Sequence, residues 1–569
     1  MSVIVRTEGD RHETPLSGPG AVVAGPFEVE VADRPDGAIA WTVANRGDRA
    51  VAVDAVALRF DVDAPAGQLR MFVNGQQSWT PSGTRVFGLD VDPSMAKGSI
   101  ARVRATHHAD PAVAAAGELR SELVTVLAAA TGPLVCVGFE GGWEHDGTLR
   151  LRPGEAGGIE LVAEAWLGGA VLEPGEQRTL HPVLLASGPD HPALLEEWAG
   201  RVGRAGGART AAPYQVGWCS WYHYFHEVTE DHLRSNLALA DAWPFDVFQL
   251  DDGYQAAIGD WLLTNEKFPS AVEKLAGAIA DAGRRPGIWV APFMAAPDSR
   301  VAANHPGWLA RWGDGDRELV SGVNPEWGGE VWTLDTTRPE VQAHLERLGR
   351  LLVEAGYTYL KLDFLYAAAL PGRWHDAGAT PAQRVREGLA AIRRGAGPDA
   401  FLLGCGCPLG PAVGIVDGMR IGPDVAPAWA PSTWLPGYVE AAPSTRNAWR
   451  NTLARSFMHR RLWLNDPDCL MLRTTDTALD EAAARAWALA VGVSGGMALV
   501  SDDLALLDDG ARRLLDEVVE LGRRADDASR AGPPPRCDDL LLPTLPARLS
   551  VDGLRLVADT SVPTAHVDR

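Results

Sequence analysis

Five apolar segments of this sequence each carry a pair of charged residues at or near their carboxyl end. In chain order the pairs are Asp251 and Asp252, Lys361 and Asp363, Arg420 and Asp424, Asp466 and Asp468, and Asp502 and Asp503. Charged groups this close to an apolar core cost several kcal/mol each unless they have partners. One such pair could be a structural ion pair, but five favour a shared functional site.

Paired carboxylates of this kind can cleave a glycosidic bond, with one attacking C1 and the other donating a proton to the leaving oxygen. Asp363 is the better candidate nucleophile. Lys361 precedes it by two residues on the same strand face, and that cation, like Arg420, favours the ionised carboxylate. Asp424 is the better candidate acid/base, because its place beyond a strand end leaves it less directly paired. It could equally be a turn or helix-capping aspartate.

Tryptophan is unusually frequent, with 20 Trp against 8 Tyr and 13 Phe. Most of these rings are expected in the core. Aromatic faces also cover the apolar face of a sugar ring, and carboxylates accept hydrogen bonds from its hydroxyl groups. Trp221, Tyr222 and Trp289 lie on or next to the apolar segments that carry no charged pair. The combination favours a carbohydrate ligand.

The segments that carry these residues alternate with helical patterns between residues 213 and 525. Eight of them are typical of buried strands: QVGWCSW (215–221), VFQLDDG (247–253), PGIWVAPF (286–293), TYLKLDF (358–364), FLLGCG (401–406), GMRIGPD (418–424), LWLNDPD (462–468) and GMALVSDD (496–503). Repeated βα units with eight strands predict a (β/α)8 barrel, in which chemistry occurs at the carboxyl ends of the strands. A doubly wound open sheet is the alternative, but its Gly-rich phosphate loop is absent from the sequence.

The flanking regions differ from the barrel. Residues 1–200 contain short alternating segments broken by Gly, Pro, Asn and Asp, a pattern that predicts a β-sandwich. Residues 533–569 predict a few short strands. The expected fold class is a multidomain α/β plus β protein, with an N-terminal β-sandwich or supersandwich, a central TIM barrel over 213–525 and a small C-terminal β domain.

Composition excludes several classes of partner. The net charge of −22 and pI near 5.1 argue against nucleic acid or an anionic membrane as the main partner. We find no apolar run of about 18 residues, so no membrane span is expected. The first residues carry no long apolar segment, and the six cysteines are scattered. We therefore expect a cytoplasmic protein with reduced thiols.

Other chemistries are compatible with some of these residues. Lys361 could form a Schiff base, although Asp363 on the same face would raise the lysine pKa, which such chemistry disfavours. The aspartates could hold a metal, but no His lies at ligand spacing beside them, and Cys405-Gly-Cys407 alone is a weak zinc signal. A non-catalytic sugar-binding protein would keep the tryptophans and some aspartates without needing both Asp363 and Asp424.

Five motifs together resemble a known family. VGWCSWYHYF, FQLDDGYQ, GIWVAPF, YLKLDF and MRIGPDVAPAW occur in this order between about residues 214 and 505. They are similar to glycoside hydrolase family 36, the α-galactosidases of clan D. NGQQSWTP (74–81) also resembles the family's N-terminal loop that reaches over the site. The resemblance implies a retaining, exo-acting enzyme that releases terminal α-linked galactose from small oligosaccharides, without a metal or organic cofactor.

The same resemblance implies roles for individual residues. Asp363 would be the nucleophile and Asp424 the acid/base. The implied substrate-binding residues are Asp251 and Asp252 on the 4-OH and 6-OH groups, Lys361 and Arg420 on the sugar, Trp289 and Tyr222 as aromatic walls, Trp221 beside them, Trp79 as a lid, and Cys405 under the ring near the 2-position. The sequence departs from the family at Leu365, where many members have Asn, and at GCGCPLGP and RIGPD.

These departures affect the expected substrate. They leave open a preference for N-acetylgalactosamine and transfer of galactose as in raffinose synthases, and Leu365 is where we expect substrate preference to differ. Family members are often oligomers, so a homo-oligomer is an expectation from the resemblance alone.

Overall fold

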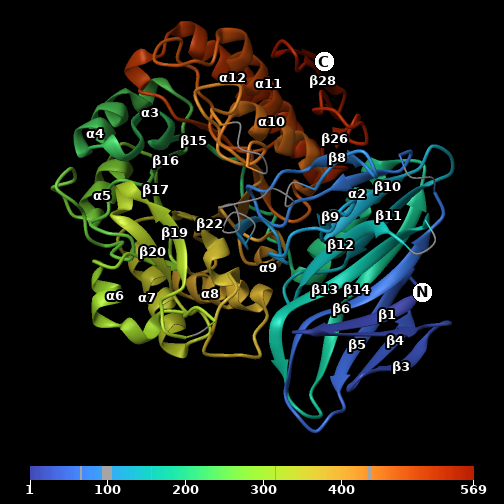
Figure 1. Cartoon of the computed structure of the whole chain (residues 1–569). Helices are drawn as coiled ribbons and strands as arrows, with labels where there is room; N and C mark the ends of the chain where they lie inside the picture. Colours follow the sequence, from blue (N-terminus) through green and yellow to red (C-terminus); the bar gives the residue numbers. More distant parts are fainter. Residues whose placement is uncertain (65–66, 93–104, 155–156, 314, 434–437) are drawn as a thin grey trace.

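The computed structural model describes residues 1–64, 67–92, 105–154, 157–313, 315–433 and 438–569. It consists of a sandwich of two antiparallel sheets, a parallel barrel beside it and a small antiparallel sheet at the C-terminus (Figure 1). In the described ranges, no helix has the length and apolar character needed to cross a bilayer.

The N-terminal part is a sandwich of two antiparallel sheets. The six-stranded sheet has the order β2 (Asp10–Pro15), β1 (Ser2–Thr7), β6 (Val51–Val62), β13 (Ile159–Leu172), β12 (Asp146–Pro153) and β9 (Leu119–Glu122). The eight-stranded sheet has the order β3 (Gly20–Ala24), β4 (Phe27–Asp33), β5 (Ala38–Asn45), β14 (Gln177–Gly188), β11 (Leu134–Phe139), β10 (Val124–Ala128), β7 (Arg70–Val73) and β8 (Gly83–Val86). Strand β4 illustrates the pattern, since Phe27, Val29 and Val31 are buried in the sandwich core while Glu28 and Glu30 face outward.

The eight barrel strands predicted from the sequence are all present and all parallel, which confirms the TIM-barrel prediction. Their spatial order is β24 (Leu464–Asp466), β23 (Gly418–Arg420), β22 (Phe401–Gly404), β21 (Tyr359–Leu362), β17 (Arg285–Val290), β16 (Val247–Leu250), β15 (Val216–Cys219) and β25 (Ala498–Val500). β24 and β25 come together where Met497 N–H donates to the Asn465 carbonyl at 3.0 Å, and Leu470 pairs with Val500 just beyond. Because the strands are shorter than predicted, seven of the ten residues in the charged pairs lie on the segments that follow the strands, and Lys361, Arg420 and Asp466 lie on the strands.

Most of the helices join successive barrel strands, whereas α2 precedes the barrel and packs on strands β10, β11 and β14 of the sandwich, and α12 follows the last barrel strand. Along the chain they are α2 (His191–Gly206), α3 (Trp221–Tyr224), α4 (Glu230–Leu239), α5 (Val272–Asp281), α6 (Arg300–Asn304), α7 (Pro339–Glu354), α8 (Pro381–Ala396), α9 (Leu409–Ala412), α10 (Thr445–Ala454), α11 (Glu481–Ser494) and α12 (Asp509–Ala531). Helix α8 shows how local sequence sets a boundary, because Thr380 and Gln383 form a capping box and Pro381 occupies the first turn.

Two small antiparallel sheets complete the fold. One, which we did not predict, is an insertion between β17 and α7 formed by β18 (Met294–Ala295), β20 (Gly329–Thr333) and β19 (Val320–Asn324). The other is the C-terminal sheet of β26 (Arg536–Cys537), β27 (Arg548–Val551), β28 (Leu554–Asp559) and β29 (Thr564–Asp568), which packs on α11. All six cysteines are buried and unpaired.

Candidate active site

A cavity of about 300 Å³ lies at the carboxyl ends of the barrel strands. Eight of the eleven site residues proposed from the sequence line it, namely Trp79, Trp221, Asp251, Asp252, Trp289, Lys361, Asp363 and Asp424. Tyr222, Cys405 and Arg420 are not among the lining residues. A larger cavity of about 880 Å³ lies between the sandwich and the start of α8, and none of the eleven residues lines it.

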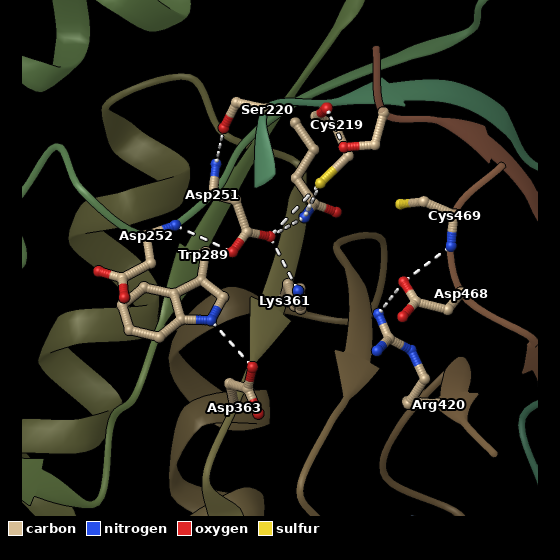
Figure 2. Close-up of polar contacts among 12 residues, drawn as sticks. Cys219, Ser220, Asp251, Asp252, Trp289, Lys361, Asp363, Arg420, Asp468 and Cys469 are labelled. Carbon is tan, nitrogen blue, oxygen red and sulfur yellow. Dashed lines mark hydrogen bonds and ion pairs between the residues drawn. The ribbon is translucent and has the colours of Figure 1, made fainter. Parts of the chain in front are cut away.

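The carboxylate of Asp363 is held by two donors. Strand β21 ends at Leu362, so Asp363 leaves the strand, and Phe364 follows in a left-handed conformation with φ 53°. Oδ2 accepts a hydrogen bond of 3.0 Å from the Trp289 indole (Figure 2), and Oδ1 accepts one of 2.7 Å from the Phe364 N–H. Such contacts fix the carboxylate at the cavity wall, the arrangement that a nucleophile requires.

Lys361 pairs with Asp251 and not with Asp363. Its ammonium group lies 2.8 Å from Asp251 Oδ2, and both side chains are buried (Figure 2). The expectation that Asp363 raises the pKa of Lys361 is confirmed, but Asp251 has the larger effect and makes the direct contact. The spacing of two residues predicts a common face but not the side-chain neighbour across strands. Burial alone would lower the pKa of Lys361, but Asp251 raises it well above its ordinary value. A lysine held protonated in this way is a poor Schiff-base nucleophile.

Asp252 is also buried beside the cavity. Oδ1 accepts a hydrogen bond of 2.6 Å from Gln255, and Oδ2 accepts one of 2.9 Å from the indole of Trp327. His226 Nδ1 lies 3.5 Å from the same oxygen. Burial raises the pKa of Asp252, and the His226 charge opposes that effect. Trp327 reaches Asp252 from the inserted sheet region, so this insertion is part of the cavity wall.

Arg420 lies among three carboxylates at the end of β23. Its guanidinium group is 3.0 Å from Asp424, 3.1 Å from Asp466 and 2.8 Å from Asp468. Asp466 and Asp468 are buried, whereas the Asp424 side chain keeps 34% of its surface exposed and lines the cavity. Burial raises the pKa of Asp424, and Arg420 opposes that effect. A carboxyl that keeps its proton more readily suits a general acid.

The fifth charged pair is separate from the cavity lining. Asp502 is fully buried against Arg473, with an Nη1–Oδ1 distance of 2.6 Å, and Asp503 caps a short helical turn. We conclude that this pair is structural. Three of the five strand ends carry charged residues that line the cavity, and the fourth pair, Asp466 and Asp468, contacts Arg420, which in turn contacts the lining residue Asp424.

Trp79 reaches the cavity from the N-terminal sandwich. Its ring packs edge-on against Phe364 and Tyr366, with centroid distances of 5.1 and 5.9 Å. The loop before it is joined to the barrel by two hydrogen bonds. Ser78 N–H donates to the Cys407 carbonyl at 3.0 Å, and Cys407 N–H donates to the side-chain Oγ of Ser78 at 3.0 Å. The chain around GCGCPLGP therefore supports the Trp79 loop.

Buried Arg455 holds the same loop from the opposite side. Its three guanidinium nitrogens donate to Asn74 Oδ1 and to the carbonyls of Gly75, Gln77, Ser78 and Ile421, at 2.8–3.2 Å. The sandwich and the barrel thus share one closely bonded wall of the cavity.

Three candidates occupy places that differ from our expectation. Tyr222 is buried behind the cavity, and its hydroxyl donates to Asp468, so it is not an exposed aromatic wall. Cys405 is fully buried and does not line the cavity. Leu365 is likewise fully buried, whereas its neighbours Phe364 and Tyr366 line the cavity and replace it as candidates for substrate preference.

Several cavity residues were missed in the sequence. They are Thr106, His107, His226, Asn324, Trp327, Phe364, Tyr366, Pro423, Tyr438, Ala441 and Pro443. For Asn324 and Trp327 a signal existed, because the segment between β17 and α7 is the long connection that inserted sheets and functional loops require. For the others, only the folded arrangement brings them together.

Comparison with known proteins agrees with this geometry. The melibiase family model matches residues 215–372. The structure of TtGalA, an α-galactosidase from Thermus thermophilus, superimposes with a TM-score of 0.72 at 29% identity, covering 95% of this chain and 99% of that one. Its stachyose complex aligns at 30% identity with a TM-score of 0.69, covering 88% of this chain and 99% of that one. The chain belongs to the melibiase family, glycoside hydrolase family 36.

More distant family 36 members share the fold. AgaA from Geobacillus stearothermophilus has a TM-score of 0.62 at 13% identity, covering 98% of this chain and 79% of that one. Among curated relatives, α-galactosidase 1 of Pediococcus pentosaceus is 26% identical over 166 residues, which are 27% of this chain and 22% of that protein. The match therefore spans about a fifth of that relative's length.

Proposed function

We propose that this protein is a retaining, exo-acting α-galactosidase that releases terminal α-linked galactose from small oligosaccharides. The observation that supports this most is the placement of two differently held carboxyl groups on one cavity. Asp363 accepts two hydrogen bonds, and Asp424 is the partly exposed carboxyl whose pKa is raised. The names of the relatives support galactose as the sugar, since TtGalA was studied with p-nitrophenyl α-galactopyranoside and with stachyose.

The proposed reaction has two steps. In the first, Asp363 attacks C1 while Asp424 donates its proton to the leaving oxygen, which gives a galactosyl-Asp363 ester and the free aglycone. In the second, Asp424 takes a proton from water, which attacks C1 and releases galactose and the Asp363 carboxylate. Lys361, Asp251 and Asp252 would bind ring hydroxyls, and Trp79, Trp289 and Trp327 would enclose the sugar.

A panel of aryl α-glycosides tests the proposal. We expect release of nitrophenol from the α-galactoside, with much slower reaction of the α-glucoside, α-arabinoside and α-N-acetylgalactosaminide. Asp363→Ala should lower kcat by several orders of magnitude. NMR of the first-formed sugar should show the α-anomer, and formation of the β-anomer would contradict retention.

The acid/base role has its own test. With a dinitrophenyl leaving group, which needs no protonation, Asp424→Ala should slow breakdown of the ester more than its formation, so a burst of dinitrophenol should appear. Azide should accelerate turnover of this variant and give galactosyl azide. Normal turnover by Asp424→Ala would remove the residue from that role.

A further inference from the structure

Arg420 presents a chemical difficulty at this site. It is in direct contact with Asp424 through an Nη1–Oδ1 distance of 3.0 Å. An adjacent cation favours the ionised form of a carboxyl group. The proposed reaction nevertheless needs Asp424 to hold a proton at the start of each turnover.

Two other carboxylates, Asp466 and Asp468, also contact Arg420. Asp466 lies opposite Arg420 in the β23–β24 pairing, with its Oδ2 3.1 Å from Nε, and Asp468 Oδ1 lies 2.8 Å from Nη2. Every guanidinium nitrogen therefore has its own carboxylate. Around the cavity floor, two cations face five carboxylates, with Arg420 and Lys361 set against Asp251, Asp363, Asp424, Asp466 and Asp468. This excess of negative charge favours retention of a proton within the cluster.

The hydrogen bonds around Asp468 indicate which carboxyl holds the negative charge. Its Oδ1 pairs with Arg420 Nη2 and accepts a hydrogen bond of 2.7 Å from the Cys469 N–H (Figure 2). Its Oδ2 accepts from the Tyr222 hydroxyl and from the Val425 N–H at 2.9 Å. These three hydrogen bonds and the ion pair leave no acceptor position for which a proton is needed. From the described residues, the Asp424 carboxyl group receives only the Arg420 hydrogen bond.

Backbone geometry shows that this arrangement is built into the loop. Asp468 has φ 89°, a conformation that costs free energy for a residue other than glycine. That conformation lets its Oδ2 accept from Val425, the residue directly after Asp424. Asp468 therefore holds both the guanidinium group that contacts Asp424 and the backbone that carries it.

We propose that Asp468 is a positioning residue that takes the charge of Arg420 and leaves the proton of the cluster on Asp424. This inference rests on the proposed function of Asp424 as acid/base. Asp466 pairs with Nε of Arg420 and so also offsets the charge of the guanidinium group. Burial raises the pKa of Asp468 to about 7 and also raises the pKa of Asp424. The three hydrogen bonds to Asp468 and its ion pair with Arg420 favour the ionised form of Asp468, and therefore the protonated form of Asp424.

Other titratable groups also face Asp424. They are Lys361 and Asp363 at the end of β21, Asp251 at the end of β16, Cys405 after β22, Tyr222 in α3, and Tyr438 from the segment before α10. Of these, only Tyr222 contacts Asp468 through a hydrogen bond in the described structure. A change in the proton affinity of Asp424 in an Asp468 variant can therefore be assigned to Asp468 and to its partners Arg420 and Tyr222.

The test is the pH profile of kcat/KM for Asp468→Asn with two galactosides. Asn cannot carry charge, so Arg420 acts more strongly on Asp424, and Asp424 loses its proton at lower pH. Methyl α-galactoside has a poor leaving group and needs the acid. For this substrate, the alkaline limb of the kcat/KM profile should move to lower pH by about one unit, and kcat/KM at pH 7 should fall about 10-fold. For 2,4-dinitrophenyl α-galactoside, which needs no acid, kcat/KM should change much less.

Two further variants make the result decisive. Asp502→Asn is the matched control, because it also removes a buried aspartate from an arginine at the same end of the barrel, and it should leave the alkaline limb in place. Tyr222→Phe removes one donor from Asp468 and should shift the limb in the same direction by less; it serves as the test if Asp468→Asn does not fold.

The outcomes separate this inference from the function on which it rests. Equal losses with both substrates and an unshifted limb would show that Asp468 has only a structural role and would overturn the inference alone. Absence of α-galactoside hydrolysis by the wild-type protein, or unchanged use of methyl α-galactoside by Asp424→Ala, would overturn the proposed function and the inference together.

Discussion

Lys361 Nζ lies 2.8 Å from Oδ2 of Asp251, and the strands to which the two residues belong are separated by β17. The pair thus links β21 to the end of β16 across the top of the intervening strand. Asp251 Oδ2 also accepts from Gln249, and Oδ1 accepts from the Asp252 N–H at 2.9 Å. The ion pair is therefore part of a buried hydrogen-bond network that fixes the positions of the residues at the base of the cavity.

Lys361→Met should destabilise the protein, because it leaves the Asp251 charge buried without its counter-ion. We expect a loss of about 3 kcal/mol in the free energy of urea unfolding, and a smaller loss in the double variant Lys361→Met/Asp251→Asn. Since Asp251 raises the pKa of Lys361 above its unfolded value, this stabilisation is fully present at neutral pH and is lost as the pH rises through the folded value. A single variant no less stable than the double variant would contradict the role of the pair.

Trp289→Phe should slow catalysis, because it removes the N–H that holds Asp363 Oδ2 while keeping an aromatic ring. The loss of a hydrogen bond to a charged group predicts about a 10- to 100-fold lower kcat with p-nitrophenyl α-galactoside. The control is Trp261→Phe, whose ring packs against Trp289 at 5.6 Å without contacting Asp363. Similar losses in both variants would indicate a packing effect only.

Trp327→Phe should weaken substrate binding more than it slows chemistry. The change removes one of the donors to Asp252, so the carboxylate is oriented less well toward a ligand. We expect KM to rise about tenfold, which is the effect of roughly 1.4 kcal/mol, with kcat nearly unchanged. Trp332→Phe, on strand β20 of the same insertion and outside the cavity lining, should behave like the wild type. A fall in kcat without a change in KM would contradict this role.

Arg455→Lys should loosen the Trp79 loop. A single ammonium group cannot replace donors to five oxygen atoms, so buried carbonyls of the loop lose their partners. We expect a destabilisation of about 2–3 kcal/mol together with a lower kcat/KM, since Trp79 would no longer be held at the cavity. The matched control is Arg450→Lys one helical turn earlier, whose contacts are Asn447 and the Glu440 carbonyl. Unchanged kinetics in Arg455→Lys would show that Trp79 is positioned by other contacts.

Glu122→Gln should change the pH dependence of stability. Burial raises the pKa of Glu122 from 4.5 to about 8, although Thr148 donates a hydrogen bond to it. The folded state therefore binds this proton more tightly than the unfolded state, and stability falls as the pH rises from about 4.5 to 8. Gln mimics the protonated form, so the variant should equal the wild type below pH 4.5 and exceed it in stability increasingly as the pH rises to about 8.

Measurements of urea unfolding across this pH range would check the prediction for Glu122. Glu118→Gln is the control, since Glu118 pairs with Arg150 at 2.7 Å and its neutralisation should destabilise the protein at neutral pH. Parallel pH curves for Glu122→Gln and the wild type would contradict the raised pKa.

The barrel could be predicted because its strands are continuous apolar runs that end in polar residues, as in VFQLDD and YLKLDF. The polar residues at the ends of these runs also predicted the position of the cavity, since the carboxyl ends of parallel strands lie at one edge of the barrel. Pairing between side chains could not be predicted. The choice of Lys361 between Asp251 and Asp363 depends on how neighbouring strands are staggered, and the burial of Tyr222 depends on Asp468, which lies 246 residues later. Trp327 was missed because its insertion has no repeated pattern.

The hydrogen bonds between Arg455 and the Trp79 loop affect the order in which parts of the protein can fold during synthesis. The contact from Arg455 to Asn74 spans 381 residues. On the ribosome, the sandwich emerges early and can fold, but the Trp79 loop lacks its Arg455 contacts until α10 and the residue after it have been made. Closure of long loops is slow, so activity should appear late in refolding, after most secondary structure has formed. A chaperone that delays collapse of the barrel would then act chiefly on the step at which this loop is captured.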